Sequence, residues 1–252
     1  MSLISLPTFS MLIAAAFAAG FVDAISGGGG LITLPVLTLA GLDPVSAIAT
    51  NKLQSSFGSG SAMLAYARAG HLRWRDVRLL AALAGLGSVA GATLVSHLPL
   101  GWVSAILPGA LILIAFYFAL SPQLGDAQTR ARMGTKPFML TVAPLIGCYD
   151  GMFGPGAGSF YMLGFVALLG YGVVKATAQT KVANFASNIA ALATLSLTGH
   201  VYWTLGFSMG VAQFFGARLG ARTAIRNGAK LIRPMLVTIC LLLAARLAWN
   251  QV

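Results

Sequence analysis

The chain has 252 residues, of which 58% are hydrophobic and only 8% are charged. A soluble domain has about a quarter of its residues charged, so this composition excludes a soluble protein and indicates an integral membrane protein. The net charge of +11 would suit a nucleic-acid-binding protein, but Lys and Arg gather near the ends of apolar segments. Cytoplasmic loops of membrane proteins collect these residues. We therefore expect a lipid bilayer as partner and no nucleic acid.

The first apolar segment, residues 8–40, is interrupted by Asp23-Ala-Ile-Ser-Gly-Gly-Gly-Gly30. Glycine costs about 1 kcal/mol relative to alanine inside a helix, and an aspartate within a bilayer is expensive unless it is satisfied. The apolar runs on either side of the break are each predicted to be shorter than the about 20 residues that span a bilayer. This pattern predicts a broken helical hairpin. Three runs of spanning length follow, at about 44–67, 76–97 and 102–120.

The same order of elements returns after a polar linker. A second broken segment, 138–170, contains Asp150-Gly-Met-Phe-Gly-Pro-Gly-Ala-Gly158. It is followed by apolar runs at about 174–197, 203–222 and 231–249. The sequence thus predicts two membrane repeats, residues 1–120 and 138–252, joined by a cytoplasmic linker, 121–137.

Residue matches between the halves support this repeat. Asp23 matches Asp150 at a separation of 127, while Lys52 matches Lys181 and Trp74 matches Trp203 at a separation of 129. One small insertion reconciles these separations. An ordered series of residue types that are rare in this chain predicts an internal duplication.

Loop charge predicts the relative orientation of the two repeats. In the first, the loop near 68–78 is basic and the loop at 97–102 lacks Lys and Arg; in the second, the loop at 198–203 lacks them and the loop at 218–233 is basic. Equivalent loops should therefore lie on opposite sides of the membrane. We predict an all-α polytopic membrane protein made of two inverted-topology repeats, each a broken helical hairpin plus three transmembrane helices. Whether the hairpins are re-entrant or cross fully stays open.

The two breaks are candidate binding elements. Irregular backbone at membrane depth must be buried in protein or line a cavity, and a helix that begins after a break offers free N–H groups and a positive dipole end to an anion. The alternative is that the glycines only permit close helix packing. The predicted substrate-binding residues in the breaks are Gly27, Gly28, Gly29, Gly30, Gly154, Gly156, Gly158 and Ser159.

Two lysines lie several residues inside their predicted spans. Intramembrane lysine is costly and is usually functional, so Lys52 and Lys181 are predicted to supply positive charge to an anion. Alternatively, each pairs with Asp23 or Asp150, or extends to the membrane interface. An Asp–Lys pair that opens on binding would join both interpretations, with the aspartates as ion-pair partners or proton carriers. The neighbouring polar residues predicted to bind substrate are Asn51, Thr180 and Asn184.

No constellation of residues indicates catalysis. The sequence has no P-loop, no nucleophile–base pair and no Cys/His spacing typical of a metal site. We therefore expect no enzyme activity, no catalytic residue, no metal and no cofactor.

Three stretches resemble a known family. Gly20-Phe-Val-Asp23-Ala-Ile-Ser-Gly-Gly-Gly-Gly30-Leu31, followed by Ala49-Thr-Asn-Lys52, is similar to the first half of the TauE/SafE-like permeases, and Tyr149-Asp-Gly-Met-Phe-Gly-Pro-Gly-Ala-Gly158 to the second half. The resemblance implies a multi-pass permease of the bacterial inner membrane for small anions. These anions are often sulfur-containing, of the sulfite, sulfonate or sulfoacetate type.

The predicted function is secondary transport of a small anion by alternating access. A channel-like pore and a non-transporting accessory protein are the alternatives. Neutralising Lys52 or Lys181 to Gln is expected to abolish transport and leave the protein folded. The substrate, the direction of transport, the coupling ion and the oligomeric state, for which a homodimer is one option, stay open.

Overall fold

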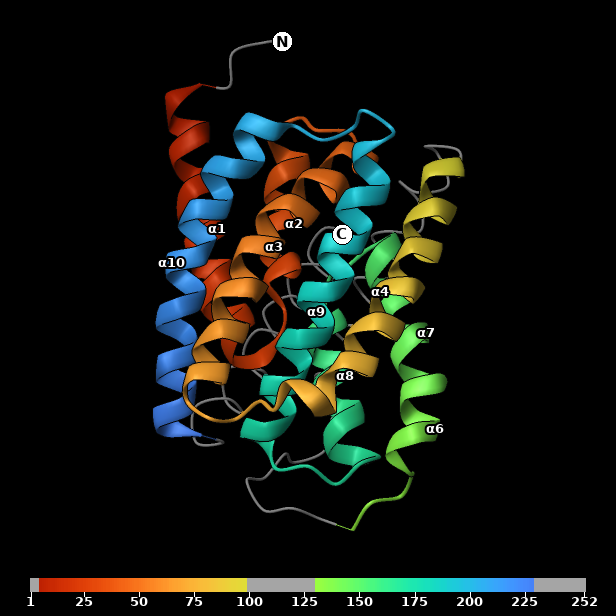
Figure 1. Ribbon diagram of the computed structural model, residues 1–252. Coiled ribbons are helices and arrows are strands. Elements are labelled where there is room, and N and C mark those ends of the chain that lie inside the picture. Colours follow the sequence, from red (N-terminus) through yellow and green to blue (C-terminus); the bar gives the residue numbers. More distant parts are fainter. Residues whose placement is uncertain (1–4, 99–129, 229–252) are drawn as a thin grey trace, which may run out of the picture.

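The computed structural model describes residues 5–98 and 130–228. Within these ranges the chain forms α-helices and no β-strand, so the predicted all-α class is confirmed there (Figure 1). The helices are α1 (Leu6–Ser26), α2 (Gly29–Leu39), α3 (Pro44–Arg68), α4 (Trp74–His97), α6 (Thr135–Leu140), α7 (Val142–Met152), α8 (Ala157–Ala167), α9 (Val173–Ser196) and α10 (Trp203–Asn227). The predicted spans at 102–120 and 231–249 lie outside the described residues, as does most of the linker.

The long helices differ in polarity. Among the described residues, α1 and α4 are both long and apolar enough to cross a membrane by length and composition. The helices α3, α9 and α10 have similar lengths of 25, 24 and 25 residues. They are more polar because α3 and α9 bury many polar side chains within the protein and α10 carries arginines toward its C-terminal end. Four predicted runs thus coincide with helices.

Both breaks are shorter than the sequence predicted. The helix α1 continues past Asp23 to Ser26, and only Gly27, with a left-handed φ of 75°, and Gly28 separate it from α2. The helix α7 likewise continues past Asp150 to Met152. The prediction that both runs beside the first break are too short to span a bilayer is wrong, because α1 has 21 residues.

The polar ends of α1 explain its length. At the N-terminus, Ser5 accepts a hydrogen bond from the Thr8 backbone N–H, and a proline occupies the first turn, both of which favour a helix start. Near the other end, the Asp23 carboxylate accepts hydrogen bonds from the next helix. The aspartate is therefore satisfied inside α1 and does not end it.

The two hairpins enter from opposite ends of the molecule. Figure 1 shows α1 and α2 joined by a turn well inside the helical body, while α6 and α7 rise toward it from the other end. The helices α3 and α9 pass through the middle, contact each other and carry the buried polar residues. The hairpin turns are thus brought to the centre of the fold.

Small residues let the outer helices approach the hairpins closely. On α10, Gly216 and Gly220 lie against the backbone carbonyls of Phe17 and Phe21 in α1. On α4, Gly87 lies against the carbonyl of Pro144 in α7. Such contacts are typical of helix packing in membranes. Helices from different halves of the sequence are therefore in close backbone contact.

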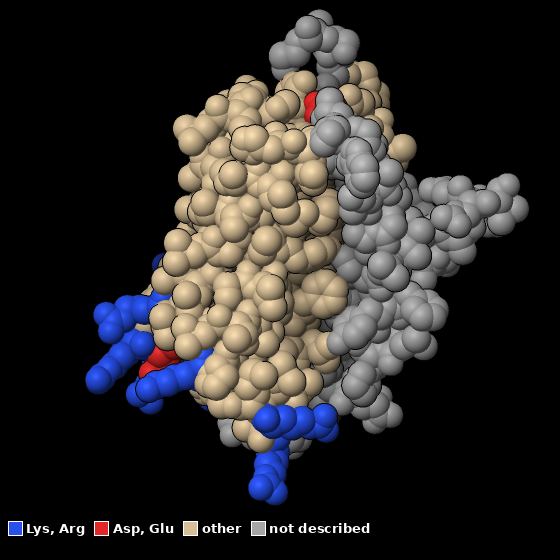
Figure 2. Space-filling view, turned by 90° about the vertical axis from the view of Figure 1, so that its right-hand side faces the viewer, with Lys and Arg blue, Asp and Glu red and all other residues tan. Residues whose placement is uncertain are grey.

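Charge is distributed unevenly along the molecule. On the face seen in Figure 2, Lys and Arg of the described residues gather at one end, and the rest of the described surface is almost free of them. This end includes the α3–α4 connection, where Arg73 forms a surface ion pair with Asp76 at 3.3 Å. Such asymmetry is typical of a protein with its basic end in the cytoplasm.

Candidate functional site

The tips of the two hairpins touch at the centre of the molecule. A Cβ atom added to Gly27 would lie 2.6 Å from the carbonyl carbon of Gly158, and one added to Gly30 would lie 3.2 Å from the Cα of Pro155. The Ser159 hydroxyl donates hydrogen bonds to the carbonyls of Ser26, at 2.9 Å, and of Gly27. The beginning of α8 is thereby tied to the end of α1.

A carboxylate occupies the beginning of α2. Oδ1 of Asp23 accepts hydrogen bonds from the backbone N–H groups of Gly28 at 3.1 Å and Gly29 at 3.3 Å. These are the free N–H groups that the sequence assigned to a substrate anion. An internal anion therefore occupies this position in the structure, which is consistent with the preference of helix N-termini for negative charge.

Lys52 and Lys181 are each bound to an aspartate from the other half of the chain. Nζ of Lys181 lies 3.0 Å from Oδ2 of Asp23, and Nζ of Lys52 lies 2.6 Å from Oδ1 of Asp150. Each ammonium group also donates to the backbone carbonyl of its aspartate. Both lysine side chains are fully buried. The sequence left open whether each lysine binds a substrate anion, pairs with an aspartate or extends to the membrane interface. In the structure each lysine pairs with an aspartate, and the two members of each pair come from different halves of the chain.

A small polar cavity of about 20 Å³ lies between the hairpin tips and the two central helices. That volume suits a single water molecule. Its lining includes Lys52, both aspartates of the ion pairs, and the side chains of Asn184 and Asn188. Two of the lining residues each have a buried oxygen without a hydrogen-bond partner, namely Oδ2 of Asp150 and Oδ1 of Asn184. Buried polar atoms without partners are unfavourable, so the cavity is suited to water or to a ligand with polar hydrogens.

The comparisons with known proteins agree with this architecture. A family model described as "Sulfite exporter TauE/SafE" matches residues 12–247. The chain belongs to this family. The chain is 50% identical to the probable membrane transporter protein ORF9 of Sinorhizobium sp, over 94% of this chain and 91% of the relative.

Other relatives carry similar names. The probable membrane transporter protein YfcA of Escherichia coli strain K12 is 44% identical, over 96% of this chain and 90% of the relative. A probable membrane transporter protein of Haemophilus influenzae is 39% identical, over 98% of this chain and 97% of the relative. No solved structure matches the chain. The TauE/SafE member is thus a membrane-embedded protein from a family of transporters and, as predicted, not an enzyme.

Most, but not all, of the site residues predicted from the sequence line the central cavity. The members that line it are Asp23, Gly28, Gly29, Gly30, Asn51, Lys52, Asp150, Gly154, Gly156, Gly158 and Asn184. Gly27 and Ser159 instead join the two tips to each other. Lys181 and Thr180 lie buried beside the cavity and do not line it.

Ser55 and Thr33 are polar residues at the site that were missed by the sequence analysis. Ser55 lines the cavity one helical turn after Asn51, and the spacing of four could have found it. The Thr33 hydroxyl donates to Oδ1 of Asn51 at 2.6 Å. No sequence spacing predicts this contact, because it joins α2 to α3 across the fold.

Proposed function

We propose that the chain is a secondary transporter that moves a small anion across the bacterial inner membrane by alternating access. The observation that carries the proposal is the pair of buried lysines, each held by a carboxylate beside a glycine break. A buried ammonium group requires a negative partner. A substrate anion that replaces one aspartate at its lysine would keep that requirement satisfied while it is bound.

The proposed substrate is a sulfur oxyanion of the sulfite, sulfonate or sulfoacetate type. Support comes from the printed name of the family model, which describes a sulfite exporter. Compact oxyanions also suit the same groups that hold the Asp23 carboxylate, namely a lysine ammonium and the backbone N–H groups of Gly28 and Gly29. The aspartate in the structure would then stand in for the substrate.

We further propose that the two halves, 1–120 and 138–252, are inverted repeats in a multi-pass fold. Support comes from contacts that recur at the sequence separations of the duplication. Gly216 contacts Phe17 as Gly87 contacts Pro144, and Lys181 contacts Asp23 as Lys52 contacts Asp150. Rocking of α1, α3 and α10 against α4, α7 and α9 would expose the lysines to one side at a time.

The central cavity is too small for such a substrate. At about 20 Å³ it accommodates one water, so binding must separate the hairpin tips. The aspartate released from its lysine would then be a buried carboxylate without a partner. Protonation removes that cost, which makes Asp23 and Asp150 candidate proton carriers in the transport cycle.

The test is substrate flux into proteoliposomes. A single Lys52→Gln change leaves Asp150 buried without its cation, which costs about 3–5 kcal/mol when one partner of a buried pair is removed. The paired variant Lys52→Gln/Asp150→Asn removes both charges and is the sharper probe. We expect it to remain folded in a thermal melt and to lose saturable flux of sulfite and sulfonates.

The matched control is Lys175→Gln, which neutralises an exposed lysine on the same helix as Lys181. This variant should transport like the unchanged protein. Undiminished flux in the folded paired variant would remove the lysine from the anion site. Flux that rises linearly with concentration and does not saturate would indicate a channel-like pore. A lack of flux of every anion tested, with the unchanged protein intact, would favour an accessory role.

A further inference from the structure

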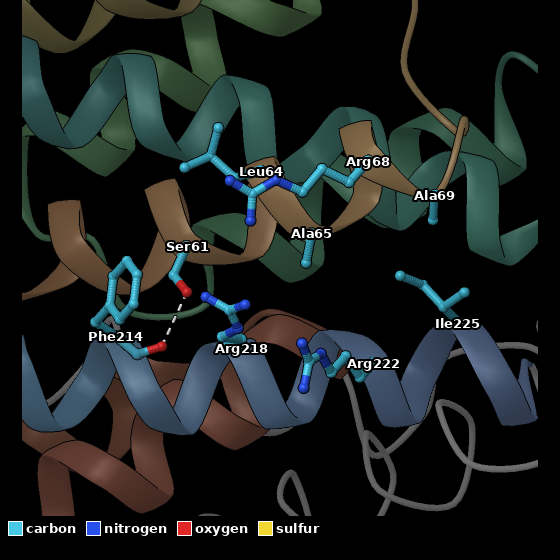
Figure 3. A pocket seen from close by; sticks show the side chains of 9 residues that line it. All are labelled: Ser61, Leu64, Ala65, Arg68, Ala69, Phe214, Arg218, Arg222 and Ile225. Atoms are coloured by element: carbon cyan, nitrogen blue, oxygen red, sulfur yellow. Dashed lines mark hydrogen bonds between the residues drawn. The ribbon is translucent and has the colours of Figure 1, made fainter.

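An open groove lies between α3 and α10, and none of the residues that line it lines the central cavity. The two helices run in the same direction, since Gly206 faces Leu53 and, farther along, the Ser61 hydroxyl donates to the Phe214 carbonyl at 2.9 Å. Beyond this contact the helices leave a groove of about 410 Å³ near their C-terminal ends. Figure 3 shows the side chains that line it.

Three arginines extend into this groove. Arg68 comes from α3, and Arg218 and Arg222 come from successive turns of α10. Within the described ranges none of the three guanidinium groups has a hydrogen bond or ion pair to protein. The groove therefore concentrates positive charge that the described part of the protein does not neutralise.

No described carboxylate is available to balance these arginines. Residues 5–98 and 130–228 contain four aspartates and no glutamate. Asp23 and Asp150 are bound to the central lysines, and Asp76 pairs with Arg73. Asp43 caps the opposite end of α3. Any anionic group that neutralises the three arginines would therefore have to come from outside the described residues.

Apart from Ser61, the rest of the groove lining is apolar. Leu64, Ala65, Phe214 and Ile225 form its walls, and Leu64 is 42% exposed. Beside the groove, α10 exposes Phe215 and Leu219, as expected for a surface in contact with lipid tails. The groove thus combines a cationic rim with an apolar wall, and it lies at the C-terminal ends of α3 and α10, whose last turns carry basic residues.

We propose that this groove binds an anionic phospholipid, with its phosphate on the three arginines and an acyl chain along Leu64 and Phe214. The guanidinium fork matches phosphate geometry and can bind it bidentately. Basic pockets between membrane helices near the cytoplasmic surface suit anionic headgroups. Because one lipid would contact both α3 and α10, its binding should stabilise this helix pair. The proposal does not depend on the transport proposal.

The test compares two triple variants with equal loss of charge. The groove variant carries Arg68→Gln, Arg218→Gln and Arg222→Gln, and the control carries Arg75→Gln, Arg78→Gln and Arg130→Gln, which are exposed and do not line the groove. Binding of phosphatidylglycerol, phosphatidylcholine and glycerol phosphate to purified protein in neutral detergent is measured by native mass spectrometry and by the shift in Tm.

We expect phosphatidylglycerol, but neither of the other two, to bind and to raise the Tm of the unchanged protein and the control. Each arginine near an anionic lipid contributes about fivefold in affinity, equivalent to about 1 kcal/mol, so the groove variant should lose about 100-fold. If that variant does not fold, Arg222→Gln alone should lose about fivefold. Equal loss in both triple variants would overturn the proposal, and so would glycerol phosphate binding as tightly as the lipid.

Discussion

At the scale of single residues, the contact between the hairpin tips depends on Gly27. Its φ of 75° lies in the left-handed region, which costs other residue types about 1–2 kcal/mol. Its missing side chain also leaves room for the backbone of Gly158, which a Cβ would approach to 2.6 Å. The backbone conformation and the close contact therefore both require glycine here.

These two requirements can be separated experimentally. Gly199 has the same φ of 75°, but a Cβ there would meet nothing within 4 Å. Gly199→Ala should therefore cost only the backbone strain, about 1–2 kcal/mol. Gly27→Ala should lower the Tm in detergent clearly further, because the hairpin tips must also move apart. Equal losses of Tm in the two variants would contradict the close contact of the tips.

The sequence located the charged residues of the site but not their pairing. A charge inside an apolar segment is costly and is usually functional. This made four residues identifiable, namely Asp23, Asp150, Lys52 and Lys181. Which aspartate binds which lysine depends on how the two halves are arranged, and spacing along the chain carries no such information. The capping of Gly28 and Gly29 by Asp23 was missed because the predicted break began at Asp23 itself.

At the scale of helices, the apolar runs and their lengths predicted the long elements well. The runs at 76–97 and 174–197 agree with α4 and α9 to within two residues at each end. The hairpins were predicted less well, because glycines and an aspartate were treated as helix breakers. The Asp23 carboxylate is satisfied within α1 by the backbone N–H groups of Gly28 and Gly29 and by Lys181, and the contact with Lys181 is tertiary. The end of α1 was therefore misplaced while its existence was predicted.

Helix α4 offers a test of the packing between helices. A Cβ on Gly91 would collide with the Cys148 carbonyl of α7, whereas one on Gly85 would meet only ordinary contacts at 3.7 Å. Gly91→Ala should destabilise by about 1–3 kcal/mol through overpacking. Gly85→Ala should be neutral or raise the Tm, because alanine favours a helix by about 1 kcal/mol over glycine. A stabilising effect of Gly91→Ala would show that α4 and α7 are not packed this closely.

At the scale of the whole molecule, the charge asymmetry predicts which end faces the cytoplasm. The α3–α4 connection belongs to the basic end, and the α9–α10 connection has no Lys or Arg. Single cysteines are placed at Arg75 and at Thr198 after Cys148 and Cys240 are changed to Ala. An impermeant maleimide should label Thr198→Cys in spheroplasts and label Arg75→Cys only after the membrane is opened.

This labelling experiment also tests the inverted arrangement. If both cysteines react from the same side of the membrane, the two connections cannot lie at opposite ends. The sequence reached this prediction from loop charge alone. It could not show that α4 packs on α7 and α10 on α1, because loop charge places a helix end on one side without naming its neighbours.

The crossed ion pairs have a consequence for how the protein is made. Asp23 and Lys181 are 158 residues apart, and Lys52 and Asp150 are 98 apart. At about 5–20 residues per second, the ribosome needs roughly 10–30 s after Asp23 before its partner exists. During that interval the first half enters the membrane with a carboxylate and an ammonium group that both lack their final partners. Neither final ion pair can therefore form before the second half of the chain has been synthesised.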